Sequence, residues 1–294
     1  MRQALLLDTL LAIGVPAASC RAVDRETQVT VALSTETRIP AELDAFAVRV
    51  FNVRTGELRF AQDYFPESGR DFPTTLAVVP ADEDSLDGPI RVELEGRSQG
   101  ALTLRRTAVI GYVEGRNLLL AMPLRMACFQ FRDCGVGATC VGGRCVPSEQ
   151  GGDALVDYDP RYVFPVAGSC FDEERCLAQA LEVTVAETDC SFPLPPGDVN
   201  VAIRWSAAPE RLLALDAEDG REGWTRLEAG RGRLSQGACD AHFRRVGPDG
   251  QLLVSDWAQK VYVATGCAPK TLLVPACFSA TTGQAGVGAV FPER

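Results

Sequence analysis

The chain has 294 residues, 46% of them hydrophobic and 23% charged, and its formal net charge is -10. This composition is typical of globular proteins and excludes an intrinsically disordered chain. The length is sufficient for two ordinary domains. A negatively charged surface repels phosphate backbones, so we expect no nucleic-acid partner.

The N-terminal residues have the order of a secretory signal peptide. Arg2 gives a positive start, residues 4–13 are mostly apolar, and the small residues 14–19 precede Cys20. This order predicts export, and the apolar run is too short to form a membrane-spanning helix. We therefore predict that residues 1–19 are a signal peptide.

Cys20, which follows Ala18 and Ser19, resembles the lipobox cysteine of bacterial lipoproteins. In that family the cysteine thiol is joined to a diacylglycerol and becomes the mature N-terminus. The resemblance implies lipidation of Cys20 and a membrane anchor, in the periplasm or on the cell surface. Ala17 stands where the family usually has leucine, and Asp8 interrupts the apolar run. The alternative is an ordinary signal-peptidase cut nearby, which leaves Cys20 free or bridged.

Residues 20–126 are predicted to form an N-terminal β-sandwich. Apolar and polar residues alternate there in short runs that are separated by turn signals, which is the pattern of half-buried strands. The alternating runs lie at residues 29–33, 46–50, 58–61, 90–94 and 102–113, and short continuous apolar runs lie at residues 76–79 and 118–120. Since few segments support a long helix, we expect an antiparallel sandwich of immunoglobulin-like or transthyretin-like kind.

Ten cysteines follow Cys20, and an even number in an exported chain predicts up to five disulfides. They are Cys128, Cys134, Cys140, Cys145, Cys170, Cys176, Cys190, Cys239, Cys267 and Cys277. Their spacing leaves the pairing open.

Residues 127–147 form a compact cysteine-rich knuckle with the pattern Cys-x5-Cys-x5-Cys-x4-Cys. Glycines between its last three cysteines let the short chain turn tightly enough to bring thiols together. The run from Cys134 to Val146 resembles a small knuckle of exported bacterial proteins and is loosely similar to EGF-type modules, families with no shared activity. Zinc is the less favoured alternative, because structural zinc sites use more closely spaced cysteine pairs.

Residues 148–157 are predicted to be a linker from their composition, and residues 158–294 a second, disulfide-rich β domain. Its strands are expected at residues 181–188, 199–206, 261–263 and 272–274, and Ser235 is placed to cap a short helix through Asp240 to Arg245. The predicted fold is therefore mainly β, with two β-sandwich-like domains joined by the knuckle. This arrangement resembles exported bacterial lipoproteins, a resemblance that implies no particular activity.

No residue is predicted to be catalytic, and no cofactor or metal is expected. His242 is the only histidine and lies in a polar stretch typical of a solvated helix face. Phosphate-binding loop motifs are absent, and the glycine-rich run Gly283–Gly288 has no helix after it. The acidic runs Asp82–Asp87 and Asp216–Asp219 are weak alternatives for calcium, since neither matches an EF-hand loop.

Three tryptophans, Trp205, Trp224 and Trp257, all lie in the second domain. Trp205 ends a strand pattern and is predicted to be core. Trp224 lies in a glycine-rich, loop-like stretch and is predicted to be exposed, where its ring can stack on a ligand.

These observations favour a lipid-anchored binding or structural module of the bacterial cell envelope, without enzymatic activity. Its expected partners are the membrane, through Cys20, and a glycan or protein ligand at Trp224. One alternative is an extracellular hydrolase that uses carboxylates of the C-terminal domain. Another is a subunit of an envelope assembly.

Overall fold

The structure, a computed structural model, describes residues 26–37, 39–40, 42–66, 72–81, 88–129, 133–164, 170–205, 211–242, 245–246, 252–253, 260–274 and 276–277. The predicted signal peptide, Cys20, the run Asp82–Asp87, Trp257 and the run Gly283–Gly288 lie outside these residues. The side chains of Trp205 and His242 also lie outside the described part.

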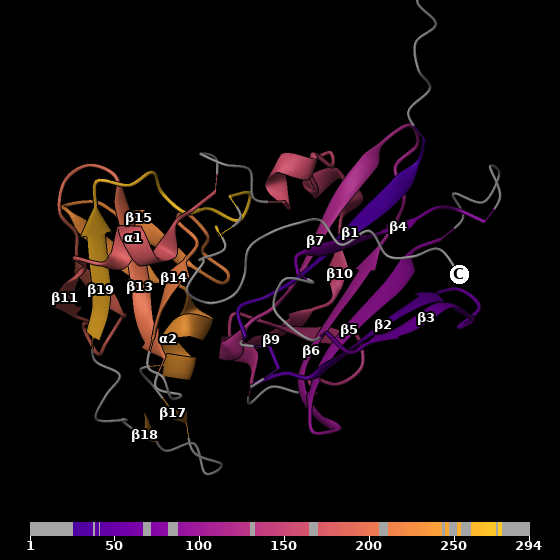
Figure 1. Ribbon diagram of the computed structural model, residues 1–294, viewed down its shortest axis with the longest axis horizontal. Coiled ribbons are helices and arrows are strands. Elements are labelled where there is room, and N and C mark those ends of the chain that lie inside the picture. The colour runs from indigo at the N-terminus through magenta and orange to yellow at the C-terminus, as the bar shows by residue number, and fades with distance from the viewer. Residues whose placement is uncertain are drawn as a thin grey trace, which may run out of the picture.

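The first domain is a sandwich of two sheets, with strand orders β4-β1-β7 and β10-β6-β5-β2-β3 (Figure 1). Its strands are β1 (Gln28–Thr35), β2 (Ala45–Asn52), β3 (Leu58–Tyr64), β4 (Thr74–Val78), β5 (Ile90–Ser98), β6 (Ala101–Ile110), β7 (Asn117–Leu124) and β10 (Glu149–Gln150). Each predicted run of alternating residues contains a strand. The sheets are mostly antiparallel, as expected, but β1 pairs in parallel with β7 and β10 in parallel with β6.

Alternation along the strands fills the sandwich with apolar side chains. In β5, Ile90, Val92 and Leu94 are buried, whereas Arg91 and Glu93 lie on the outer face and form an ion pair with a 2.8 Å contact. Successive side chains of a strand point to opposite faces, so one face of each sheet is apolar. Burial of this apolar face is the main stabilising contribution to the domain.

The knuckle is part of the first domain. It consists of the 3-10 helix η2 (Met126–Cys128) and the hairpin β8 (Ala138–Val141) and β9 (Arg144–Pro147). It is closed by the disulfides Cys128–Cys140 and Cys134–Cys145. Cys128 and Cys140 are buried in the same core as the sandwich, so the knuckle packs as one body with it.

Residues 148–157 are not a linker, contrary to the prediction from composition. β10 extends the sheet beside β6, and Leu119 N donates a hydrogen bond to Val156 O at 2.9 Å. The 3-10 helices η3 (Gly152–Ala154) and η4 (Pro160–Tyr162) continue this segment along the first domain. Main-chain hydrogen bonds hold this polar, glycine-rich segment against the first domain. Amino-acid composition does not predict such bonds, because every residue type can form them.

The second domain has two larger sheets, with orders β11-β19-β13-β14 and β12-β16-β15, and the two-stranded sheet β17-β18. Its elements are α1 (Glu173–Leu177), β11 (Leu181–Thr184), β12 (Ser191–Pro193), β13 (Val199–Trp205), β14 (Arg211–Leu215), β15 (Trp224–Leu227), β16 (Arg231–Leu234), α2 (Gln236–His242), β17 (Arg245–Val246), β18 (Leu252–Leu253) and β19 (Lys260–Thr265). The larger sheet is buried on both faces, by α1 on one side and by the smaller sheet on the other (Figure 1). The prediction of a mainly β fold is confirmed.

Three more disulfides hold the second domain together: Cys170–Cys277, Cys176–Cys267 and Cys190–Cys239. All ten cysteines that follow Cys20 are therefore paired, as predicted. Each such bond restricts the unfolded chain and typically stabilises a fold by about 2–4 kcal/mol. Disulfides of this number are typical of proteins exported to an oxidising compartment.

The helix that Ser235 was expected to cap is present as α2. Ser235 Oγ accepts a hydrogen bond from Ala238 N at 3.3 Å, and the helix ends at His242, before the predicted end. The strand predicted at 272–274 is wrong, because this segment is a turn in which Val274 N donates to Thr271 O.

The prediction that Trp224 is an exposed ligand platform is wrong. Trp224 is the first residue of β15, is only 1% exposed, and packs near Phe192 with 6.4 Å between ring centroids. The glycines before it are typical of a loop. However, Gly223 lies against the main chain of Asp216, where a Cβ atom would lie 1.9 Å from Asp216 O, so only glycine fits there. Pairing with β16 then directs the indole ring into the core between the two sheets.

We expect Trp224→Ala to lower the free energy of unfolding by about 3–5 kcal/mol, because it leaves a cavity in a close-packed core. Denaturant unfolding followed by circular dichroism measures this change. The exposed Glu228, replaced by alanine, is the control and should change stability by less than about 0.5 kcal/mol. Equal stability of the two variants would contradict the assignment of Trp224 to the core.

Candidate functional site

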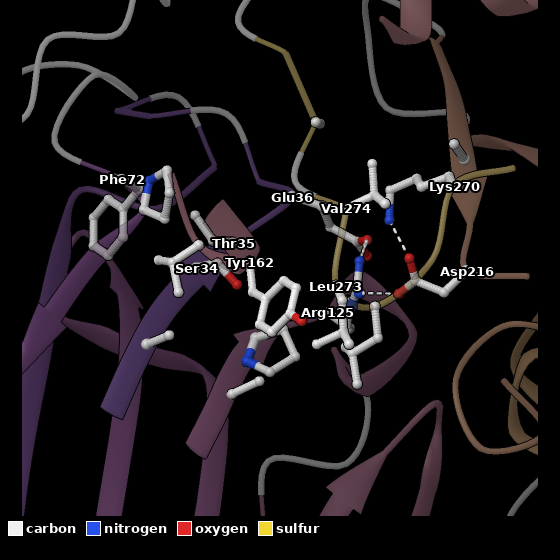
Figure 2. A pocket seen from close by; sticks show the side chains of 18 of the residues that line it. Ser34, Thr35, Glu36, Phe72, Arg125, Tyr162, Asp216, Lys270, Leu273 and Val274 are labelled. Carbon is white, nitrogen blue, oxygen red and sulfur yellow. Dashed lines mark hydrogen bonds and ion pairs between the residues drawn. The ribbon is translucent and has the colours of Figure 1, made fainter. Parts of the chain in front are cut away.

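A cavity of about 220 Å³ lies between the two domains (Figure 2). Its floor is the outer face of the sheet β4-β1-β7, where the small side chains of Ala32, Ser34, Ala121 and Pro123 line it. The residues that alternate with them in β1 and β7 fill the core of the sandwich. Leu119 also faces the cavity from β7, but the other outward positions carry small residues, which leaves room above the sheet.

Larger apolar side chains form the walls. Phe72 stands at one end of the cavity, and Tyr162 and Leu273 lie between it and a charged end (Figure 2). Val274, beside Leu273, comes from the turn that was predicted to be a strand. The cavity thus has an apolar body and one polar end.

The charged end consists of Glu36 and Arg125 from the first domain and Asp216 and Lys270 from the second (Figure 2). Arg125 Nη1 donates to Glu36 Oε2 at 3.2 Å, and Arg125 Nη2 donates to Asp216 Oδ2 at 2.7 Å. Lys270 Nζ donates to the other oxygen of Asp216. Glu36 Oε1 also accepts a hydrogen bond from Met126 N at 2.6 Å. Two cations and two carboxylates thus balance in charge.

Buried hydrogen bonds hold Lys270 in position. The side chain of Asn200, the second residue of β13 and only 1% exposed, accepts from Lys270 N at 2.8 Å and donates to Ala268 O at 3.2 Å. The disulfide Cys176–Cys267 anchors the start of the same loop. A satisfied buried amide of this kind fixes a loop conformation, so the ammonium group has little freedom to leave Asp216.

A second ion pair, between Arg106 and Glu222, also crosses the domain boundary. Glu222 Oε1 accepts a further hydrogen bond from Gly142 N at 3.2 Å. Gly142 lies at the tip of the knuckle hairpin with φ +55°, and a Cβ there would lie 2.3 Å from Arg221 O. In α2, a Cβ on Gly237 would lie 1.7 Å from Gly142 O. The two domains therefore meet backbone to backbone at this point, and the cavity between them has a defined shape.

Three largely buried groups at the boundary, Asp216, Glu222 and Arg125, have pKa values that favour their charged forms. Burial raises the pKa of Asp216, but the positive charges of Arg125 and Lys270 lower it by more, so it lies below its ordinary value. Burial likewise raises the pKa of Glu222, and Arg106 and Arg125 lower it by more. Burial lowers the pKa of Arg125, but Asp216 and Glu36 raise it above its ordinary value. These three groups can therefore position one another or a ligand, but they are not suited to exchange protons with it.

The charged end still offers hydrogen-bond donors. An ammonium group has three N–H donors, and Lys270 gives one of them to Asp216. Arg125 Nε is buried and has no partner among the described residues. Because Arg125 Nε is inaccessible, the remaining N–H groups of Lys270 are the donors at this end that a ligand can use.

Of the residues predicted from the sequence, Asp216 and the disulfide-bonded Cys277 line this cavity. In the run Asp216–Asp219, Asp216 faces two cations, whereas Asp219 accepts a hydrogen bond from Arg221 N at 2.9 Å. Burial raises the pKa of Asp219. Its carboxylate and that of Asp216 have different hydrogen-bond partners, so the two do not form a common set of oxygen ligands for calcium. Within the described ranges, no group of three or more His, Cys, Asp or Glu residues is arranged to hold a metal ion.

Sequence reasoning missed Glu36, Arg125 and Lys270, which are far apart along the chain. The signal that the sequence offered was their position after a strand, because Glu36 directly follows β1 and Arg125 directly follows β7. Because β1 and β7 run in parallel, their C-terminal ends lie side by side at the same end of the sheet. Without the parallel pairing, this proximity is not visible in the sequence.

No known family model matches this chain, and no curated protein matches it. In the part of the chain that the structure describes, no helix is both long enough and apolar enough to cross a membrane. The function is therefore argued from the geometry and chemistry of the site.

We expect Asp216→Asn to destabilise the protein by about 3–5 kcal/mol near neutral pH, because two largely buried cations lose their shared counter-charge. The pKa of Asp216 is lower in the folded state than in the unfolded chain. Its stabilising contribution is therefore complete above about pH 4, the unfolded value, and is lost as the pH falls through the folded value. The difference from the wild type should shrink in strong acid.

Urea unfolding at neutral and at strongly acidic pH measures both effects. Asp153→Asn, at an exposed carboxylate, is the matched control and should leave stability nearly unchanged. A stability loss for Asp216→Asn that did not depend on pH would mean that its charge is not the source of the effect.

Proposed function

We propose that this protein is an exported, lipid-anchored binding module of the bacterial cell envelope, and that its ligand enters the cavity between the two domains. The observation that carries the proposal is the cavity itself, which combines apolar walls with a charged end. Ligand sites are typically concave and mostly apolar, with a few fixed polar groups, and they often lie between domains.

The lining of the cavity favours a particular class of ligand. The apolar body between Phe72 and Leu273 suits an aliphatic or aromatic group, and the remaining donors of Lys270 suit a carbonyl oxygen. A sugar ring needs many polar partners, which the small apolar floor does not offer. Of the two ligand classes expected from the sequence, these features favour a peptide or protein over a glycan.

Rigidity supports binding as the role of this site. Disulfides brace both domains, and the ion pairs Arg125–Asp216 and Arg106–Glu222 connect them. A preformed site loses little conformational freedom when the ligand binds, so more of the contact energy appears as affinity.

The hydrolase alternative gains no support from the carboxylates of this cavity. Asp216 is held in its ionised form, and Glu173 Oε1 accepts a hydrogen bond from Ala214 N at 2.7 Å. Acid catalysis of glycoside cleavage needs a carboxyl group that stays protonated beside the substrate. A binding role is therefore the better account of this site.

The proposed lipid anchor predicts a specific intact mass for the protein purified from the membrane fraction. The mature chain should begin at Cys20, carry lipid, and react with no alkylating agent until it is reduced. Cys20→Ser should leave the membrane fraction and lose the lipid mass. A wild-type chain without lipid, or one with thiols that react before reduction, would overturn the anchor and leave the cavity to be tested by itself.

The proposed ligand cavity predicts binding of anilinonaphthalene sulfonate, whose apolar rings and anionic group match its two ends. Ala121→Phe places a ring on the cavity floor and should weaken binding by at least about tenfold, equal to ~1.4 kcal/mol. Ala101→Phe, at an exposed position in β6, is the control and should bind like the wild type. Fluorescence titration measures both, and equal affinities for the two variants would contradict binding in the cavity.

A further inference from the structure

The edge of β7 that faces the second domain is only partly used. β7 is the last strand of the sheet β4-β1-β7 and lies on the side of the first domain nearest to β14 (Figure 1). Leu119 N donates to Val156 O at 2.9 Å, and Asn117 O accepts from Tyr158 N at 2.7 Å. The segment after the knuckle thus already pairs with the first half of this edge, so the edge accepts a strand.

The second half of the edge carries main-chain groups that are open for pairing. N–H and C=O groups alternate between the two sides of a strand, so Ala121 and Pro123 direct theirs away from β1, as Asn117 and Leu119 do. Among the described residues, no main-chain group outside the strand pairing of β7 bonds to Ala121 or Pro123. Both residues line the cavity floor, so the strand edge that carries these groups borders the cavity.

We propose that the ligand is an extended peptide that continues the pairing along β7 and places one apolar side chain in the cavity. Main-chain groups removed from water need hydrogen-bond partners, and a peptide strand added to a sheet edge supplies them. This inference rests on the proposed function, because it names the class of ligand for the same cavity.

The geometry of the edge limits the pairing to a short segment. Pro123 has no N–H, so the donors of this edge end at Ala121. The peptide is left with about four main-chain hydrogen bonds, to Leu119 O, Ala121 N, Ala121 O and Pro123 O. Specificity then depends on the apolar side chain and on a carbonyl group that reaches the remaining N–H donors of Lys270.

The test uses a random library of acetylated, amidated hexapeptides, screened against the mature protein for displacement of anilinonaphthalene sulfonate. We expect binders with an apolar central residue. Their N-methylated analogues keep the side chains but lose one main-chain donor, and should bind about five- to tenfold more weakly. Bound peptide should also slow hydrogen exchange of the Ala121 amide, measured by NMR.

Two protein variants isolate the edge itself. Ala121→Pro removes the N–H that points away from β1, and Pro123 on the same edge indicates that the fold accepts proline there. It should weaken peptide binding about five- to tenfold, whereas Ala121→Ser, which keeps the N–H, should not.

The outcomes separate this inference from the proposed function. Strand pairing is overturned if the dye binds but no peptide in the library displaces it, or if N-methylation and Ala121→Pro leave peptide affinity unchanged. In both cases the proposal that the cavity binds a ligand is unaffected. If the dye itself does not bind in the cavity, the proposed function fails.

Discussion

The carboxylate of Asp216 is the point on which the two-domain arrangement depends. It is nearly inaccessible to water, and its two oxygens are shared between Arg125 of the first domain and Lys270 of the second. A buried charge of this kind is tolerated only when its partners are held in place. Glu36 orients Arg125, and Asn200 orients the loop of Lys270, so both partners are themselves fixed.

Close backbone contact at the knuckle makes this arrangement rigid. Gly142 at the hairpin tip and Gly237 in α2 touch without side chains between them, and Glu222 caps the contact through Gly142 N. Gly142, one of the knuckle glycines that were expected to allow disulfide formation, therefore also serves domain contact. The consequence for function is a cavity whose floor belongs to one domain and whose charged end belongs to both.

Much of the first domain was predictable because its strands follow simple alternation. Ile90, Val92 and Leu94 reveal β5 without any knowledge of its neighbours, and the even number of cysteines after Cys20 predicted the set of bridged thiols. The second domain was harder, since short strands such as β15 and β16 contain too few residues to establish a period. Trp224 was misplaced for this reason: its glycine neighbours are typical of a loop, and only pairing with β16 makes it a core residue.

The sequence by itself determined the fold class, the export-type cysteine content and the absence of several catalytic motifs, because these follow from local periodicity, composition and residue counts. Only the tertiary structure decided the pairing of the cysteines, the role of residues 148–157 and the position of the cavity. Each of these depends on contacts between residues that are far apart in the chain. Glu36, Arg125, Asp216 and Lys270 meet because β1 and β7 run in parallel and the knuckle seats one domain against the other.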